Sequence, residues 1–131
     1  MAVLALLAGC GGGGDDGDSA PSQNRTELEI AVWPSGRSGN KEEATLLCSP
    51  PGGTLPDPEA ACERLESMKR PFMRPPDQVV CIEIYGGPAV AEVRGTFNGK
   101  EVNATFARSD GCAIDLWDRH QLLFPAQPAQ P

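Results

Sequence analysis

Residues 90–106 read VAEVRGTFNGKEVNATF, and this stretch predicts a β-hairpin. Two runs that alternate apolar and polar residues flank Asn98-Gly99, a pair that strongly favours a two-residue type I′ turn. The inward-facing positions would be Val93, Gly95 and Phe97 on the first strand and Val102, Ala104 and Phe106 on the return strand. Because only one face of this hairpin is apolar, it must pack on further elements, and the fold is built around an antiparallel sheet.

Further strands are predicted on both sides of the hairpin. Thr26–Trp33 alternates apolar and polar residues, as expected of a half-buried strand. Ala44–Ser49 predicts a second short strand, which ends at a Pro-Pro-Gly-Gly break. We expect residues Gln121–Phe124 to supply a last short strand.

One helix is predicted between the second strand and the hairpin. Asp57 followed by Pro58 is typical of a helix start, with an N-cap acceptor and then proline at the first helical position. The apolar stripe that follows consists of Ala61, Leu65, Met68 and Phe72. The predicted fold is therefore α+β: a five-stranded antiparallel sheet with one or two helices packed on one face.

Composition limits the possible partners. The chain has 131 residues, about the size of one domain, and a formal net charge of −7. This charge argues against nucleic acid and anionic membrane surfaces as partners, because both would repel it. A chain with 5% aromatic residues, 15 glycines and 13 prolines builds a modest core and gains from covalent cross-links.

The N-terminus resembles the lipobox of bacterial lipoproteins, since residues 5–10 read ALLAGC. We interpret residues 1–9 as a signal peptide whose true start codon lies upstream, Cys10 as a lipidated cysteine and residues 10–25 as a flexible linker. The alternative is a chance apolar N-terminus. The chain is expected to be exported, either lipid-anchored to the outer face of the bacterial cell membrane or secreted. No later apolar run is long enough to span a bilayer, so the lipid would be the only membrane attachment.

Four of the five cysteines remain when Cys10 is set apart, namely Cys48, Cys62, Cys81 and Cys112. An even number in an exported domain predicts two disulfides, and the sequence alone leaves three pairings open. A zinc site is the competing interpretation, but no pair has C-x-x-C spacing and the chain holds one histidine. We therefore predict no metal and no cofactor.

No catalytic constellation is visible in the sequence. The single histidine, His120, falls in a predicted loop with no serine or cysteine nucleophile beside it, so we expect a surface or capping residue. Gly36-Arg37-Ser38-Gly39-Asn40 nearly matches the G-x-S-x-G of a hydrolase, but Asn40 breaks the motif. The chain is predicted not to be an enzyme.

The cysteine motifs, taken in order, resemble the bacterial subtilisin-inhibitor family, the Streptomyces type. The resemblance covers residues 28–124, and we place the domain at 26–125, with a disordered tail at 126–131. The stretches that carry it are TLLCSP at 45–50, AACERL at 60–65, VC-x-x-x-Y at 80–85, VRGTFNGKEV at 93–102, SDGC at 109–112 and LLF at 122–124.

This resemblance implies a five-stranded antiparallel sheet with helices on one face, commonly dimerised through the sheet. It implies the disulfides Cys48–Cys62 and Cys81–Cys112. It also implies a serine protease inhibitor whose reactive bond is Glu83–Ile84. Beside that bond, the protease would contact Cys81, Ile82, Tyr85 and Gly86.

The region 79–88, VVCIEIYGGP, would thus be a rigid peptide offered to a protease, with Glu83 entering its specificity pocket. Such enzymes bind extended peptides through backbone pairing, and a loop already held in shape avoids the ordering cost. The alternative from pattern alone is a half-buried strand whose one charge faces water. Gly86-Gly87-Pro88 is expected to be more flexible than the family's usual loop exit.

Glu83 departs from the family, whose best-known members carry a non-acidic residue there. An apolar pocket would have to desolvate its carboxylate, which is costly. The expected target is an extracellular serine protease, subtilisin-like or chymotrypsin-like, that prefers Glu or has broad specificity. The alternatives are a non-inhibitory surface lipoprotein that serves as a binding module on the same fold, and an enzyme or metal protein that depends on His120.

Overall fold

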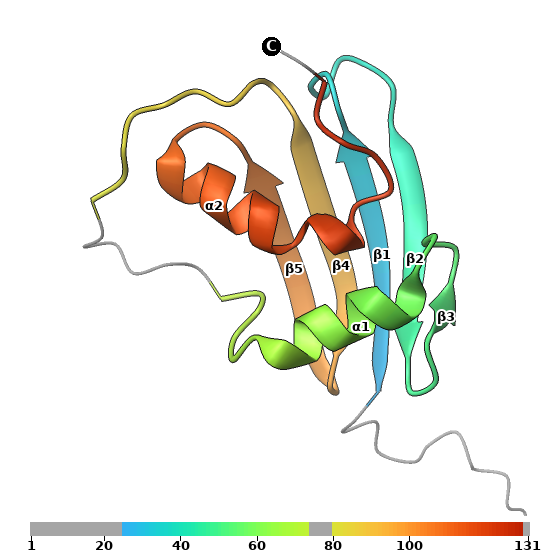
Figure 1. Cartoon of the computed structure of the whole chain (residues 1–131). Coiled ribbons are helices and arrows are strands. Elements are labelled where there is room, and N and C mark those ends of the chain that lie inside the picture. Colours follow the sequence, from blue (N-terminus) through green and yellow to red (C-terminus); the bar gives the residue numbers. More distant parts are fainter. Residues whose placement is uncertain (1–24, 74–79, 130–131) are drawn as a thin grey trace, which may run out of the picture.

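The computed structural model describes residues 25–73 and 80–129. Within these ranges a five-stranded antiparallel sheet has the order β3-β2-β1-β4-β5. The strands are β1 (Thr26–Trp33), β2 (Glu42–Cys48), β3 (Gly52–Gly53), β4 (Val90–Phe97) and β5 (Lys100–Ala107). The helices α1 (Pro58–Ser67) and α2 (Gly111–Arg119) and the short 3-10 helix η2 (Gln121–Leu123) all lie on one face of this sheet (Figure 1). The predicted α+β architecture is confirmed.

The predicted hairpin is β4–β5, with Phe97 opposite Lys100. Asn98 and Gly99 have φ values of 50° and 81°, the positive pair that a type I′ turn requires. The Gly99 N–H donates to the Arg25 carbonyl at 2.9 Å, and the Asn98 N–H donates to the Thr26 hydroxyl at 3.0 Å. These bonds fix the tip of the hairpin to the start of β1.

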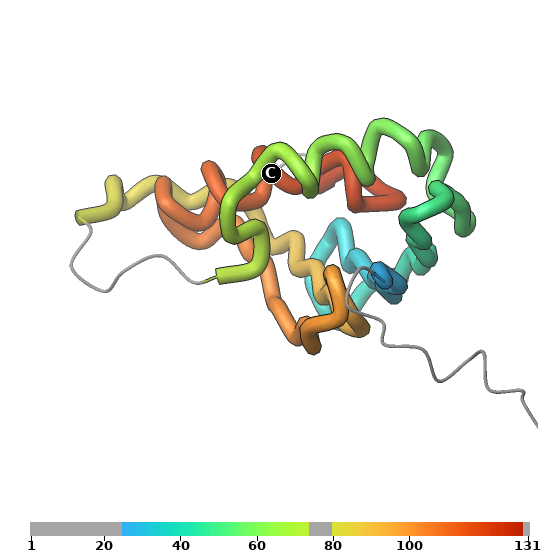
Figure 2. The backbone as a smooth tube through the Cα atoms, turned by 90° about the horizontal axis from the view of Figure 1, so that it is seen from below, coloured from blue at the N-terminus to red at the C-terminus, as the bar shows by residue number. Residues whose placement is uncertain are grey.

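The core lies between the sheet and the helical layer. Figure 2 shows the backbone of these two layers from below. From β1 it takes the alternating residues Leu28, Ile30 and Val32, all buried. From the helical side it takes Leu65, Trp117, Leu123 and Phe124. The Phe124 ring lies 4.7 Å from the Trp117 ring and 5.4 Å from that of Phe106, so the C-terminal segment packs directly onto β5.

The strand predicted at Gln121–Phe124 was wrong. Residues 121–123 form η2, and the fifth strand is β3, which pairs with Leu46 and Leu47 of β2. Leu123 and Phe124 belong to the helical layer that covers the sheet, where both are buried, and they do not pair with an edge strand. A short apolar run is compatible with either arrangement, because its length carries no clear period.

The predicted helix is α1, and its cap is confirmed. The Asp57 side chain accepts the Ala60 N–H at 3.1 Å, and Pro58 follows at the first position. The helix ends at Ser67, but Met68 and Phe72 still pack against the core. The Cys48–Cys62 disulfide, with Cα atoms 5.9 Å apart, ties α1 to β2 as the family resemblance implied.

No helix in residues 25–73 and 80–129 is long and apolar enough to cross a membrane. The signal peptide, Cys10 and most of the linker lie outside these ranges, as do Val79 and the last two residues of the chain. Residues 126–129, expected to be part of a disordered tail, lie within the described range. There the Ala129 N–H donates to the Pro34 carbonyl at 3.1 Å.

Candidate functional site

Residues 80–88 form a loop beside α2, not the start of a strand, and regular pairing begins only at Val90 (Figure 1). Its apolar side chains are unusually exposed. Val80 is 93% exposed, Ile82 68% and Tyr85 67%. Apolar groups gathered in this way on a loop mark a surface that binds a partner, because they gain by leaving water.

Glu83 lies at the tip of this loop. The Ile84 N–H donates to the Ile82 carbonyl at 2.9 Å, which closes a three-residue turn centred on Glu83. The Glu83 side chain is exposed, and it makes no hydrogen bond or ion pair within the described residues. The backbone is therefore bent at Glu83, where the sequence predicted an extended segment.

The chain before Glu83 is bound to the N-terminal end of α2. The Gly111 N–H donates to the Ile82 carbonyl at 2.7 Å. A Cβ atom on Gly111 would lie 3.2 Å from the Ile82 carbonyl oxygen, so glycine permits this close approach. The Cys81–Cys112 disulfide, with Cα atoms 5.2 Å apart, adds a covalent link and confirms the second pairing implied by the family.

One cluster near this disulfide could be mistaken for a metal site. Ligand atoms of Cys81, Asp110 and Cys112 lie within 4.8 Å of one another. The two sulfurs are joined to each other, and the Asp110 side chain accepts the Ala113 N–H at 2.8 Å to cap α2. All three groups thus serve the structure, and the cluster is not suited to bind a metal.

The chain after Glu83 is held at Gly86. Its N–H donates to the Arg108 carbonyl at 2.7 Å, and its carbonyl accepts from Arg108 Nε at 3.3 Å. A Cβ atom on Gly86 would lie only 2.8 Å from Ile114 Cδ1, so the loop passes close to α2 here. Gly87 is buried. The exit predicted to be flexible is thus fixed at its first residue.

His120 is not a surface residue, and that part of the prediction was wrong. It is 1% exposed, packed between the rings of Phe72 and Phe106, because its ring closes the gap between α2 and the segment after α1. Nδ1 lies 2.8 Å from the Leu116 carbonyl and Nε2 contacts the Pro71 carbonyl. As predicted, it does cap a helix, since it ends α2.

Burial lowers the pKa of His120, because the charged imidazolium is poorly solvated there. The nearby guanidinium groups of Arg64 and Arg119 lower it further, whereas the two carbonyls act in the opposite direction. No nucleophile is among its ring contacts in the described residues. His120 also lies at the end of α2 opposite to the one that contacts the loop, so its role is structural.

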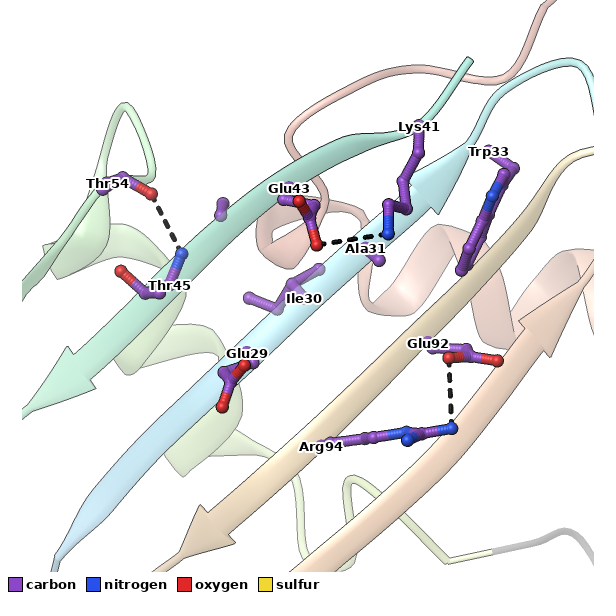
Figure 3. A pocket seen from close by; sticks show the side chains of 11 residues that line it. Glu29, Ile30, Ala31, Trp33, Lys41, Glu43, Thr45, Thr54, Glu92 and Arg94 are labelled. Atoms are coloured by element: carbon purple, nitrogen blue, oxygen red, sulfur yellow. Dashed lines mark hydrogen bonds and ion pairs between the residues drawn. The ribbon is translucent and has the colours of Figure 1, made fainter. Parts of the chain in front are cut away.

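The sheet face away from the helices has a shallow depression of about 420 Å³ (Figure 3). Trp33 lies at one end of it, with the Arg37 guanidinium 4.6 Å and the Lys41 ammonium 5.6 Å from its ring centre. Lys41 pairs with Glu43, and Glu92 pairs with both Arg37 and Arg94. These charges largely neutralise one another, and no group here is set up for catalysis.

Sequence reasoning missed the elements that support the loop. Helix α2 was not predicted as such, although Asp110 has the signature of an N-cap and Trp117 falls on an apolar face. Nothing in the sequence pointed to Arg108, because its contact with Gly86 joins residues 22 positions apart. Gly111 appeared only as part of the SDGC stretch, and no sequence pattern indicated that its backbone N–H supports the loop.

The family model "Subtilisin inhibitor-like" matches residues 21–108. "Subtilisin inhibitor-like protein 5" of Streptomyces fradiae is 34% identical over 95 residues, covering 70% of this chain and 88% of that protein. "Subtilisin inhibitor" of Streptomyces violaceus is 34% identical over 122 residues, covering 86% and 80%. Among solved structures, Streptomyces caespitosus sermetstatin in complex with Bacillus licheniformis subtilisin has a TM-score of 0.49 at 23% identity, covering 74% of this chain and 96% of that one.

These matches confirm the resemblance drawn from the cysteine motifs. Since members of this family are inhibitors and not enzymes, the prediction that the chain is not an enzyme is confirmed as well. The chain belongs to the subtilisin inhibitor-like family.

Proposed function

We propose that this protein inhibits a serine protease by presenting residues 81–86 as a substrate-like loop, with Glu83–Ile84 as the reactive bond. One observation carries the proposal. Glu83 is exposed at the tip of a loop whose two flanks, at Ile82 and Gly86, are both hydrogen-bonded to the rest of the domain.

The anchored flanks favour tight binding because they reduce the entropy lost on association. Fixing the backbone of a flexible residue costs roughly 1–2 kcal/mol. A free peptide would lose this amount at each position that the enzyme orders, whereas this loop is largely ordered before it binds. The exposed Ile82, Ile84 and Tyr85 add apolar surface that can be buried against the enzyme.

The backbone at the tip is available for an enzyme. The Ile82 carbonyl is occupied by Gly111 and Ile84, while the N–H and carbonyl of Glu83 make no hydrogen bond within the described residues. A protease can therefore pair with the Glu83 N–H and place its carbonyl oxygen among the donors that stabilise an oxyanion.

Glu83 sets the specificity. Its carboxylate would lose water on entering an apolar pocket, and this loss is unfavourable unless a cation or hydroxyl donors replace the water. We therefore expect a Glu-preferring or broad-specificity endopeptidase, subtilisin-like or chymotrypsin-like, as the target.

A titration against a panel of serine proteases tests the function. The panel should contain Glu-specific, subtilisin-like and chymotrypsin-like enzymes, and the protein should inhibit at least one at or below micromolar concentration. Mass spectrometry after long incubation should find the only new ends at Glu83 and Ile84. Absence of inhibition across the panel at micromolar protein would overturn the proposal.

The second candidate is a binding module on the same fold without inhibitory activity, and the acidic residue at the tip favours it. Glu83→Lys and Glu83→Met separate the two. If the loop is competent, the first variant should inhibit a trypsin-like enzyme and the second a subtilisin-like one, because only the pocket residue has changed. If neither variant inhibits any enzyme, the binding module is the better description.

Export and attachment through Cys10 complete the proposal. Trp33 at the end of β1 pairs with Val90 at the start of β4, so the loop joins the sheet at the end opposite to Arg25. A tether before Arg25 would then leave the loop pointing away from the membrane. Cys10→Ala should move the protein from the membrane fraction to the soluble fraction, and an unchanged distribution would exclude lipidation at this residue.

A homodimer through the uncovered sheet face is proposed on the basis of its charges. This face carries Glu29 and Glu43 together with Lys41 and Arg94, and the pairs that the two cations make within the chain are long, 3.4 Å, with both cations exposed. Two copies related by a two-fold axis can therefore exchange these partners and match opposite charges across the interface. Sedimentation velocity at low and high salt tests this. A monomer at both salt concentrations and at protein concentrations up to tens of micromolar would rule the dimer out.

A further inference from the structure

Arg108 lies where the leaving side of the proposed reactive bond meets the scaffold. It follows directly after β5, and it bonds to both backbone groups of Gly86. Its own carbonyl accepts the Gly86 N–H at 2.7 Å, and its Nε donates to the Gly86 carbonyl at 3.3 Å. One residue thus fixes a peptide unit on each side of the Gly86 Cα.

The Arg108 side chain is itself held in place. One of its terminal nitrogens donates to Asp118 Oδ1 at 3.1 Å, and its guanidinium carbon lies 5.6 Å from the centre of the buried Trp117 ring. The side chain is only 17% exposed, so it has little surface to offer to a protease. Its planar fork can serve Gly86 and Asp118 together, which a lysine cannot do.

Gly86 is the position where such a hold is needed. Glycine has the widest backbone freedom of any residue, and another glycine follows it. A side chain at position 86 could not supply the rigidity, because its Cβ would lie 2.8 Å from Ile114 Cδ1 and 3.1 Å from Arg108 Cβ. The two hydrogen bonds to Arg108 therefore restrict the backbone at position 86, which a residue larger than glycine could not do there.

We propose that Arg108 is a positioning residue that keeps Ile84 beside Glu83 after the bond between them is cleaved; this inference rests on the proposed function. During cleavage the protease serine oxygen bonds to the Glu83 carbonyl carbon, the bond from that carbon to the Ile84 nitrogen breaks, and this nitrogen takes the serine proton through the enzyme's base. In the reverse step the Ile84 amine attacks the acyl carbon, returns the proton and releases the serine. If water attacks instead, a Glu83 carboxylate and an Ile84 ammonium result.

The anchor point decides which of these outcomes dominates. Ile84 lies two residues from Gly86, so it can move at most about 7 Å from that anchor. If Gly86 is released, the next core residue is Ala89, which is 1% exposed, and the five residues from Ile84 to Ala89 reach about 17 Å. Re-formation then competes less well with water, and the inhibitor behaves more like a substrate.

The test compares Arg108→Met and Arg108→Lys with the control Arg119→Met. Methionine keeps apolar length without a donor, so Arg108→Met removes the side-chain bonds to the Gly86 carbonyl and to Asp118, while the backbone bond from the Gly86 N–H to the residue 108 carbonyl remains. Lysine keeps the charge without the fork. Arg119 is a matched control because it pairs with Asp115 on α2 at 2.9 Å and, within the described residues, makes no hydrogen bond or ion pair with the loop. Each protein is incubated with a small amount of the protease that wild type inhibits, starting from intact and from cleaved chain.

Because the substitution removes the side-chain half of the hold on Gly86, we expect Arg108→Met to lose intact chain roughly three- to tenfold faster than wild type and to reach a higher ratio of cleaved to intact protein. Arg108→Lys should fall between the two, and Arg119→Met should match wild type. Thermal melting identifies the temperature range in which every variant is folded, and the ratios are measured there.

The outcomes separate this inference from the function on which it rests. If wild type inhibits and Arg108→Met reaches the same ratio at the same rate, the inference is overturned while the function stands. If Arg108→Met only melts earlier, Arg108 has a general structural role and the inference is again overturned. If wild type inhibits nothing on the panel, the proposed function fails and the inference falls with it.

Discussion

Replacing Gly86 with alanine tests how closely the loop must pass the scaffold. The new Cβ atom would lie 2.8 and 2.9 Å from two carbons of Ile114 and 3.1 Å from Arg108 Cβ. Carbon atoms prefer about 3.5–4.0 Å, so the loop must move away by several tenths of an ångström. Forcing an extra methyl group into a packed contact costs about 1–3 kcal/mol. If that energy is lost from the bound geometry of the loop, the inhibition constant rises roughly 5- to 150-fold.

The inhibition constant and the melting temperature of Gly86→Ala measure the two places where this energy can appear. Strain that the whole domain shares would lower the melting temperature by about 4–8 °C for each kcal/mol. The double variant Gly86→Ala with Ile114→Ala removes the two closest atoms and should recover most of the inhibition, with the Arg108 contact leaving a remainder. Gly39→Ala is the control, because its nearest contact is 3.5 Å. Wild-type behaviour of Gly86→Ala, or no recovery in the double variant, would refute the reasoning.

Three further predictions concern the rest of the scaffold. Cys81→Ser with Cys112→Ser should remove about 4 kcal/mol of stability in the chain-entropy model for a separation of 31 residues, and should speed cleavage after Glu83. Denaturant unfolding measures the first effect and the incubation assay the second, and unchanged cleavage would argue against a role of the disulfide in holding the loop. Because burial keeps the pKa of His120 below its ordinary value, the unfolded chain binds the extra proton first, and wild type should lose stability as pH falls below about 6.5. The free energy of unfolding of His120→Gln, measured in parallel from pH 7.5 to 5.5, should depend less on pH, and equal slopes of the two curves would contradict this. Asp110→Ala should lower the free energy of unfolding by about 1 kcal/mol through loss of the α2 cap, and it should weaken inhibition. Asp57→Ala at the α1 cap should lower stability by a similar amount and leave inhibition unchanged. Equal effects on inhibition would show that the α2 cap has no special link to the loop.

The parts of the fold that the sequence predicted correctly depend on neighbouring residues. The β4–β5 hairpin follows from Asn98-Gly99 and from alternation on either side, and the start of α1 follows from Asp57 and Pro58. The wrong strand at Gln121–Phe124 has the opposite origin. Phe124 packs against the rings of Trp117 and Phe106, and these tertiary contacts are not visible in a short apolar run.

The candidate site divides in the same way. The disulfide pairing implied by the family resemblance is the one found, whereas the choice of Glu83, which the same resemblance implied, stays a prediction. The bend at Glu83 and the hold on Gly86 could not be predicted. The bend is closed by one local bond, from the Ile84 N–H to the Ile82 carbonyl, and the hold on Gly86 comes from two bonds to Arg108, 22 residues downstream. Neither leaves a pattern in composition or period.

That downstream segment explains how one short piece of chain can hold both sides of the proposed reactive bond. Within residues 108–112, Arg108 binds Gly86, Gly111 binds Ile82 and Cys112 is bonded to Cys81. The anchors on the two sides are thus only three residues apart, at most about 10 Å of chain, and the end of β5 and the first turn of α2 fix that distance from outside. Cleavage between Glu83 and Ile84 would leave every one of these bonds in place. The same segment that shapes the intact loop would then keep the two new ends together.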